Sequence, residues 1–350
     1  MSGRLPPPVI VGPSAWVGSH LSKKRKLWHS RWSNNEIKHL EHAAEHFISS
    51  SVDLVNISKN NFPLPLIENR LKNLQHKLIS GIGFELISGL PIEKYSIEES
   101  STIFCGIGSH LGKARSQNSS GHILGHVRDT GVNVKDKNTR IYQTSERQSF
   151  HTDSSDVVAL FCLRTAKEGG KSLLVSTETI YNEMNRIRPD LTPLLFDPIA
   201  TDRRGEIPVG EKPYFKIPVL NWYMGQLTGM YQRQYIDSAQ RFSDVLQITD
   251  EHIEALDLFD NLANDPRLYI SMQLEPGDLQ FVYNHSQLHD RTAFTDWPES
   301  DKRRHLLRLW LSMPDDRPLP YFFKERFGSI EIGNRGGIIT PGTNLNVPLR

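Results

Sequence analysis

A chain of 350 residues, of which 37% are hydrophobic, can bury a large core, and its 41 basic and 40 acidic residues leave a formal net charge of +1. This balance gives no sign of a nucleic-acid or membrane partner, and no stretch approaches the roughly 18 apolar residues of a membrane-spanning helix. The two cysteines, Cys105 and Cys162, are too few for a disulfide framework, so we expect buried free thiols in a cytoplasmic protein without a signal peptide.

The first third of the chain is predicted to be an arm followed by helices. Residues 1–30 are rich in Pro, Ser and Lys and are expected to lie as an extended arm over a core. Residues 31–115 are expected to be largely helical, because capping boxes begin helices at Ser33 and Ser96. A strand ending in a turn is predicted within 83–91.

The remainder reads as short strands with a few helices. Strand-like segments separated by turn signals lie at 157–163, 171–176, 214–220, 268–274, 279–284 and 305–312, and helices are predicted near 177–189 and 249–263. Because strands and helices do not alternate regularly, we expect one domain over residues 1–350, with a β sandwich or barrel at 140–315 and helices outside. Residues 117–129 are read as a loop that could form a lid, with His122 and His126 structural.

The stretch QSFHTDSSDVVALF places a histidine two residues before an aspartate. If it is extended, His151 and Asp153 project to one side, where they could chelate a cation or form a hydrogen-bonded pair. A second stretch offers His285 and His289, whose spacing matches helical zinc proteases, but the residue after His285 is Ser and the surroundings are strand-like. One of these two could complete a two-His, one-carboxylate set with open positions, which suits non-haem Fe(II) oxygenases.

A third stretch, DKRRHLLRLWLS, carries charge into an apolar run. In a strand, Arg304 and Arg308 share one face, and Arg308 would be a cation within a buried segment. Such a cation needs a partner, which is either a carboxylate of the fold or the carboxylate of a bound acid. The chain pattern leaves both alternatives open.

These three stretches, in this order and with a Gly-Gly turn between them, resemble the taurine dioxygenase-like (TauD/TfdA) family of Fe(II)/2-oxoglutarate-dependent oxygenases. The resemblance spans roughly residues 80–312 and is closest to fungal members. It implies an α+β, mainly β fold with a double-stranded β-helix (jelly-roll, cupin-like) core and surrounding helices. It also implies that His151, Asp153 and His289 bind iron, with His285 a neighbour in the second shell or core.

The same resemblance assigns the cosubstrate site. Arg308 would clamp the distal carboxylate of 2-oxoglutarate, Arg304 would be a second contact near the other end, and Ser172 of the GGKS turn would help to hold the distal carboxylate. Asp290 stands where many relatives have Gly and would bring a carboxylate near the metal's rim. Related halogenases lack the metal carboxylate, so Asp153 predicts that this chain does not halogenate.

The activity implied by the resemblance is oxidation of a C–H bond with O2 and release of succinate and CO2. The expected substrate is small and polar, an amino acid or related acid, processed by hydroxylation, desaturation or oxidative cyclisation in secondary metabolism. Candidate substrate contacts are Gln148, Phe150 and Arg291. Two alternatives remain: a zinc-type metallohydrolase on the same His/Asp/His set, and a non-catalytic protein that binds a small acid.

Overall fold

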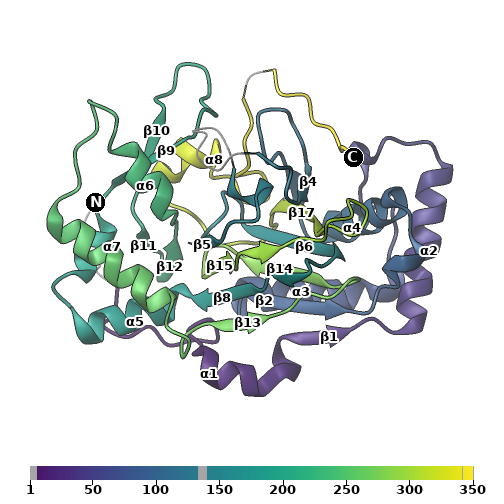
Figure 1. Ribbon diagram of the computed structural model, residues 1–350, viewed down its shortest axis with the longest axis horizontal. Coiled ribbons are helices and arrows are strands. Elements are labelled where there is room, and N and C mark those ends of the chain that lie inside the picture. The colour runs from purple at the N-terminus through teal and green to yellow at the C-terminus, as the bar shows by residue number, and fades with distance from the viewer. Residues whose placement is uncertain (1–5, 133–139, 341, 350) are drawn as a thin grey trace.

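Two β-sheets lie face to face at the centre of the computed structural model, which describes residues 6–132, 140–340 and 342–349 (Figure 1). The major sheet has seven strands, in the order β1 (His29–Arg31), β2 (Phe84–Ser88), β14 (Leu279–Tyr283), β6 (Val157–Arg164), β17 (His305–Ser312) and β3 (Lys113–Arg115), with β4 (Leu124–Val127) also paired to β17. The minor sheet has four, in the order β13 (Ile270–Met272), β8 (Ser172–Ser176), β15 (Gln287–Arg291) and β5 (Gln148–His151). The central pairings of both sheets are antiparallel, so the expected mainly β, jelly-roll core is confirmed.

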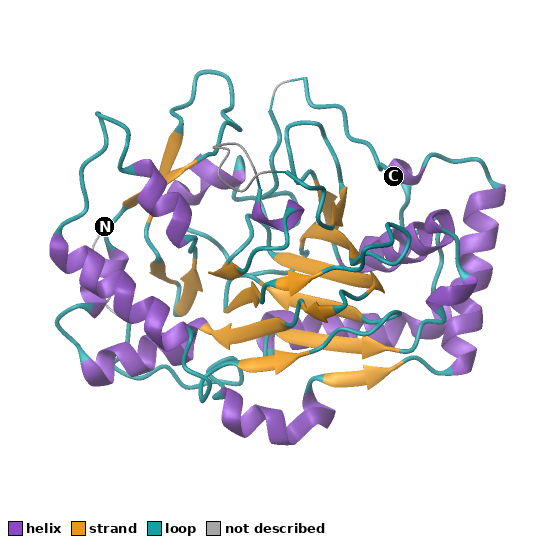
Figure 2. Ribbon diagram, in the orientation of Figure 1, coloured by secondary structure: helices purple, strands orange, loops and turns teal. Residues whose placement is uncertain are grey.

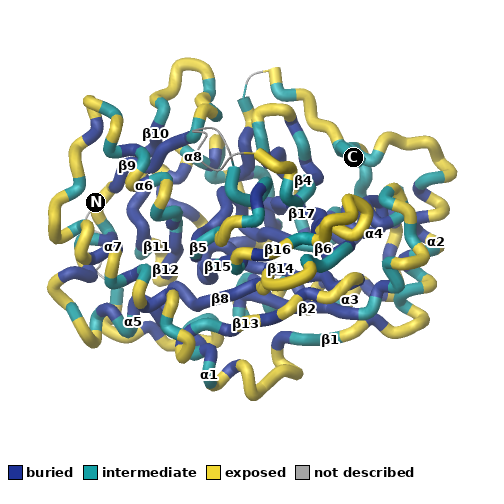
Figure 3. Tube along the Cα trace, viewed as in Figure 1, coloured by how far each residue is buried: buried dark blue, intermediate teal, exposed yellow. Residues whose placement is uncertain are grey.

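Alternate residues of each strand enter different cores, as the pleat of a strand requires. On β6, Val158 and Cys162 face the minor sheet, whereas Ala159 and Phe161 face the helices on the other side of the major sheet. Leu174 of β8 closes the core between the two sheets. Strands that are buried on both faces carry near-continuous apolar runs. The apolar strand segments predicted from the sequence are of this kind, and they lie in the buried middle of the molecule (Figure 3).

Helices cover the outer face of each sheet (Figure 2). Helices α2 (Asn34–Ser49), α3 (Glu68–Ser80) and α4 (Ile97–Leu111) pack on the major sheet, and α5 (Thr177–Ile187) and α7 (Asp250–Ala263) pack on the minor sheet. Both predicted capping boxes are present, at Ser33 with Glu36 and at Ser96 with Glu99. The remaining α-helices and strands are α1 (Gly18–Leu21), α6 (Arg233–Ala239), α8 (Lys324–Phe327), β7 (Glu168–Gly169), β9 (Ile199–Asp202), β10 (Tyr214–Ile217), β11 (Leu220–Tyr223), β12 (Gln226–Gly229) and β16 (Phe294–Thr295).

Two expectations about local structure are wrong. The predicted strand over 214–220 is divided, because Pro218 and Val219 separate β10 from β11. The segment 117–129 is not simply a lid loop, because residues 124–127 form β4 and pair with β17 in the major sheet. His122 and His126 are structural as expected, since His126 contacts His305 and the C-terminal segment.

Within the described part of the chain, none of the helices combines the length and the apolar character that crossing a membrane requires. Cys105 and Cys162 are both buried and unbridged, as expected. Cys105 lies between α4 and the major sheet, and Cys162 lies between the two sheets, so each acts as a small apolar side chain.

Candidate metal centre

Two imidazoles meet where β5 and β15 pair in the minor sheet. His289 of β15 lies directly opposite His151 of β5 in the register, and the two ring centroids are 4.1 Å apart. Neighbouring positions on both strands, Phe150 and Leu288, point instead into the core beneath α5 and α7. The alternation of each strand therefore sends both histidines into the space between the sheets.

Asp153 joins the two imidazoles from just beyond the end of β5. The strand ends at His151, so the expected extended run through Asp153 is not present, yet a bend returns its carboxylate to the same place. His151 Nε2 lies 3.9 Å from Asp153 Oδ1, and His289 Nε2 lies 3.6 Å from Asp153 Oδ2. The Asp153 backbone N–H donates to Asn284 Oδ1 at 3.0 Å, and the Trp310 indole N–H donates to Asp153 Oδ2 at 2.9 Å.

The protonation states suit a cation. His151 Nδ1–H donates to the Ser149 carbonyl at 2.8 Å, which leaves the Nε2 lone pair facing the cluster, where the Gln148 amide now donates to it. Burial, reinforced by His289, lowers the pKa of His151 to about 3, so this imidazole is neutral at ordinary pH. Burial alone would raise the pKa of Asp153, but Arg308 and His289 bring it below its usual range.

Arg308 lies at the edge of this cluster. Its Nη1 is 3.7 Å from Asp153 Oδ2, and its Nε–H donates to Gln117 Oε1 at 2.7 Å. Gln117 in turn donates to the Arg308 carbonyl at 2.8 Å, while the rings of Tyr142 and Trp310 lie 4.6 Å and 5.1 Å from the guanidinium carbon. The Arg308 side chain is thus held in one orientation beside the three candidate ligands.

A cavity opens next to two of the three candidate ligands, His151 and Asp153. Its lining includes His151, Asp153, Arg308 and Gln148, together with Arg140, Ile141, Tyr142, Ser149, Thr152, Ser154, Gln232, Gln234, Tyr235, Trp310 and Arg326. Most of these side chains are polar, and three are arginines. Polar groups in a concave site fix the orientation of a small molecule, and here they outnumber the apolar side chains.

Arg304, Arg291 and Ser172 form a second polar group outside the lining of this cavity. The guanidinium carbons of Arg291 and Arg304 lie 4.8 Å and 5.1 Å from the centre of the Phe294 ring, and Ser172 pairs with Arg291 in the sheet register. Arg304 Nη1 and Arg291 Nε are buried without a hydrogen-bond partner among the described residues. Two buried cations with unpaired donors are costly, so an anion here would be stabilising.

Two further expected contacts, Phe150 and Asp290, are not in the cavity wall either. Phe150 packs against Tyr269, with ring centroids 5.9 Å apart, on the opposite side of β5 from His151. Asp290 likewise faces away from His289 and accepts a hydrogen bond from Arg147 at 2.6 Å, so it does not reach the metal's rim. Both follow from strand alternation, which moves each immediate neighbour of a ligand to the other face.

Sequence reasoning missed Trp310, Gln117 and Arg326. Trp310 could have been found, because it lies two residues beyond Arg308 and so shares its face of β17. Gln117 and Arg326 come from segments whose position relative to β17 depends on the whole fold. No local pattern marks them.

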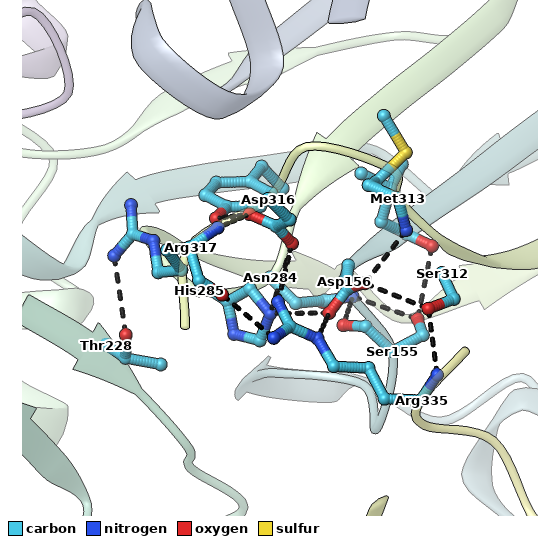
Figure 4. Close-up of polar contacts among 12 residues, drawn as sticks. Ser155, Asp156, Thr228, Asn284, His285, Ser312, Met313, Asp316, Arg317 and Arg335 are labelled. Carbon is cyan, nitrogen blue, oxygen red and sulfur yellow. Dashed lines mark hydrogen bonds and ion pairs between the residues drawn. The ribbon is translucent and has the colours of Figure 1, made fainter. Parts of the chain in front are cut away.

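His285 belongs to a second buried cluster that also contains Asp156 and Asp316 (Figure 4). His285 Nε2 lies 2.8 Å from Asp156 Oδ1, and Arg335 donates to Asp156 Oδ1 and Asp316 Oδ2, both at 2.8 Å. The other carboxylate oxygens accept from Tyr283, Ser312 and backbone N–H groups. The guanidinium of Arg335 already supplies the cation here, and His285 has the core role that was expected as one alternative.

Comparison with known proteins decides the family. The sequence model of the taurine catabolism dioxygenase TauD, TfdA family matches residues 50–310. The chain belongs to this family. It is 31% identical to the FR-33289 synthase of Streptomyces rubellomurinus (strain ATCC 31215) over 315 residues, covering 89% of this chain and 92% of that protein.

Solved structures agree on the fold. Asparagine oxygenase in complex with Fe(II), 2S,3S-3-hydroxyasparagine and succinate superposes with a TM-score of 0.63 at 17% identity, covering 81% of this chain and 93% of that one. The non-heme iron oxygenase OrfP in complex with Fe and alpha-ketoglutaric acid gives a TM-score of 0.62 at 14% identity, with the same coverages. The expected dioxygenase class, which uses iron and 2-oxoglutarate, is confirmed.

Proposed function

We propose that His151, Asp153 and His289 hold the Fe(II) ion of this 2-oxoglutarate-dependent oxygenase. The observation that carries the proposal is that two imidazole nitrogens and a carboxylate oxygen converge beside a cavity. Two nitrogens and one oxygen on one side of an ion are the donor set of non-haem Fe(II) oxygenases, whereas a structural zinc site would close with four ligands. Iron bound here would activate O2 with electrons from the 2-oxo acid.

The protein's own groups prepare that site. His151 is fixed in the tautomer that presents Nε2, and Trp310 orients the Asp153 carboxylate, so both ligands are held before the metal arrives. Gln148, expected to contact substrate, lines the cavity and bonds to His151 Nε2, so it must move when a metal binds. Arg308 offsets the charge of Asp153 and lines the cavity together with Tyr142.

We propose that Arg308 and Arg304 bind different carboxylates of 2-oxoglutarate. Arg308 lies beside Asp153, so it would contact the carboxylate next to the metal. Arg304 directly precedes β17, four residues before Arg308, which is about 13 Å along an extended chain at the Cα positions. With Arg291 it offers unpaired donors that would suit the distal carboxylate, which reverses the order expected from the resemblance. Ser172 lies beside Arg291 in the sheet register, and its hydroxyl donates to Gln280 Oε1 at 3.0 Å.

The organic substrate is proposed to be a small polar molecule, an amino acid or a related acid. The polar lining of the cavity supports this, and both solved structures are of enzymes that share this fold, one with hydroxyasparagine bound. We also propose a single catalytic domain and a cytoplasmic location. All three large cores draw on strands of the 140–315 segment, and both thiols are free and buried.

The proposal is tested by loading the protein with Fe(II) and measuring succinate formed from 2-oxoglutarate in air. We expect slow formation without a second substrate. An Arg304→Met variant should need about tenfold or more 2-oxoglutarate, because it loses a charge-assisted hydrogen bond. The matched variant Arg303→Met, whose guanidinium is exposed, should behave as wild type. Activity with zinc alone, without use of 2-oxoglutarate, would instead support the hydrolase alternative.

A further inference from the structure

A third arginine lies in the cavity wall, outside the part of the chain that matches the family. Arg326 belongs to α8, beyond the matched residues 50–310. Its Nε–H donates to Ser154 Oγ at 2.7 Å, and Ser154 directly follows Asp153. Its guanidinium carbon lies 5.5 Å from the centre of the Phe215 ring. The guanidinium group of Arg326 is therefore held at a fixed place next to the proposed metal site.

The cavity carries an excess of positive charge. Its lining contains three guanidinium groups, of Arg140, Arg308 and Arg326, but one carboxylate, that of Asp153. Arg140 forms an ion pair with Glu206, whereas Arg326 has no ion pair with any described carboxylate. Burial, with the fields of Arg140 and Arg203, lowers the pKa of Arg326 to about 9. A cation in this field is unfavourable until an anion arrives.

We propose that Arg326, assisted by Arg140, binds an oxyanion of the organic substrate, a carboxylate or a phosphonate. The proposal rests on the proposed function, which assigns Arg308 and Arg304 to 2-oxoglutarate and so leaves Arg326 for the second organic molecule. Gln234 and Tyr235 of α6 line the same cavity and can donate to further oxygens of the anion. Because Ser154 ties Arg326 to the residue after Asp153, the anion would set the distance between the substrate and the metal.

A structural role for Arg326 is the competing explanation. The arginine also joins α8 to the Ser154 bend, where the Gly337 N–H donates to the Ser154 carbonyl at 2.7 Å. A purely structural arginine would change the melting temperature and the metal cluster without discriminating between anionic and neutral small molecules. Binding selectivity is therefore the readout that separates the two roles.

The test uses protein loaded anaerobically with Fe(II) and 2-oxoglutarate, and calorimetric titration with three probes. The probes are β-alanine, its counterpart β-alaninamide, in which a neutral carboxamide replaces the carboxylate, and 2-aminoethylphosphonate. We expect wild type to bind at least one of the two anions and to bind β-alaninamide much more weakly, and Arg326→Gln to lose about tenfold or more in anion affinity. Whichever of the carboxylate and the phosphonate binds more tightly identifies the oxyanion.

Control measurements distinguish a loss of anion binding from a loss of iron or 2-oxoglutarate binding. Visible absorption of the same samples reports iron and 2-oxoglutarate binding, and it should be unchanged in Arg326→Gln. Arg326→Lys should recover part of the anion affinity, and Lys324→Gln, which removes an exposed charge from the same helix, should match wild type. Equal anion affinity in Arg326→Gln and wild type would overturn the proposal, as would equal binding of β-alanine and β-alaninamide. Loss of the absorption signal in wild type would overturn the proposed function itself.

Discussion

Two buried clusters of imidazole and carboxylate groups lie close together in the sequence and differ in what completes them. In the cluster of His151, Asp153 and His289, Asp153 Oδ1 accepts no hydrogen bond from a described residue, and the group borders a cavity. In the cluster of Asp156, His285 and Asp316, every carboxylate oxygen accepts a hydrogen bond and Arg335 is completely buried. We call the first the open cluster and the second the sealed cluster.

The difference shows that the residue types in a cluster do not by themselves decide whether it can bind a metal; the groups around the cluster decide it. Each cluster brings three possible ligand atoms within 4.8 Å of one another, so proximity alone would make both metal sites. A guanidinium fills the sealed cluster and satisfies its charge, whereas the open cluster presents lone pairs to a cavity. We therefore propose the open cluster as the cation site, whereas the ion pairs of the sealed cluster join separate segments of the chain.

The largest expected effect is on iron binding and activity, which should depend on the open cluster and not on the sealed cluster. Asp153→Ala should abolish iron binding and reduce succinate formation by more than about a hundredfold, because it removes a ligand rather than a supporting group. Asp316→Asn in the sealed cluster should keep one iron per chain. Iron content by plasma emission and succinate by chromatography measure both. Loss of iron from Asp316→Asn in a folded protein would erase the distinction.

A substitution in the sealed cluster should lower the stability of the fold rather than iron binding. Arg335→Leu leaves two buried carboxylates without their cation, so the free energy of unfolding should fall by about 3–5 kcal/mol. Urea denaturation of the iron-free protein measures this. Arg317→Leu is the nearby comparison, because its guanidinium bonds to Leu227 and Thr228 and not to these carboxylates. An unchanged midpoint in Arg335→Leu would contradict the account.

Removing a single donor sharpens the comparison further. Trp310→Phe deletes the N–H that orients Asp153, so iron affinity should fall by about ten- to a hundredfold. Tyr283→Phe deletes the hydroxyl that donates to Asp316 and should leave iron affinity unchanged. Competition with a colorimetric chelator measures both. Similar affinities in the two variants would show that the open cluster does not depend on its surroundings.

The smallest expected effect concerns the pH dependence of stability and comes from a histidine outside both clusters. Burial, with His126, lowers the pKa of His305 to about 3, so the folded state keeps it neutral. The unfolded chain takes up a proton as the pH falls through about 6.5, so stability is lost between about pH 6.5 and pH 3, by roughly 2 kcal/mol at pH 5. His305→Gln should show a shallower loss in thermal unfolding from pH 7 to 5. An identical slope would contradict this assignment.

The sequence predicted much of the fold because its signals are local. The capping boxes at Ser33 and Ser96 and the apolar runs of β6 and β17 depend on neighbouring residues alone. The register that sets His289 opposite His151 could not be read, because it joins segments 138 residues apart. The same holds for Gln117 beside Arg308, and for Phe150, whose direction depended on which face of β5 met the cavity.

The most direct test of the central claim is an anaerobic titration of the protein with Fe(II) and then 2-oxoglutarate, followed by visible absorption. The account predicts a charge-transfer band that saturates at one iron per chain. The band should be absent in His151→Ala and present in His285→Gln, provided that each variant remains folded by circular dichroism. A band that persists in His151→Ala, or one that disappears in folded His285→Gln, would contradict the assignment of the open cluster as the metal site.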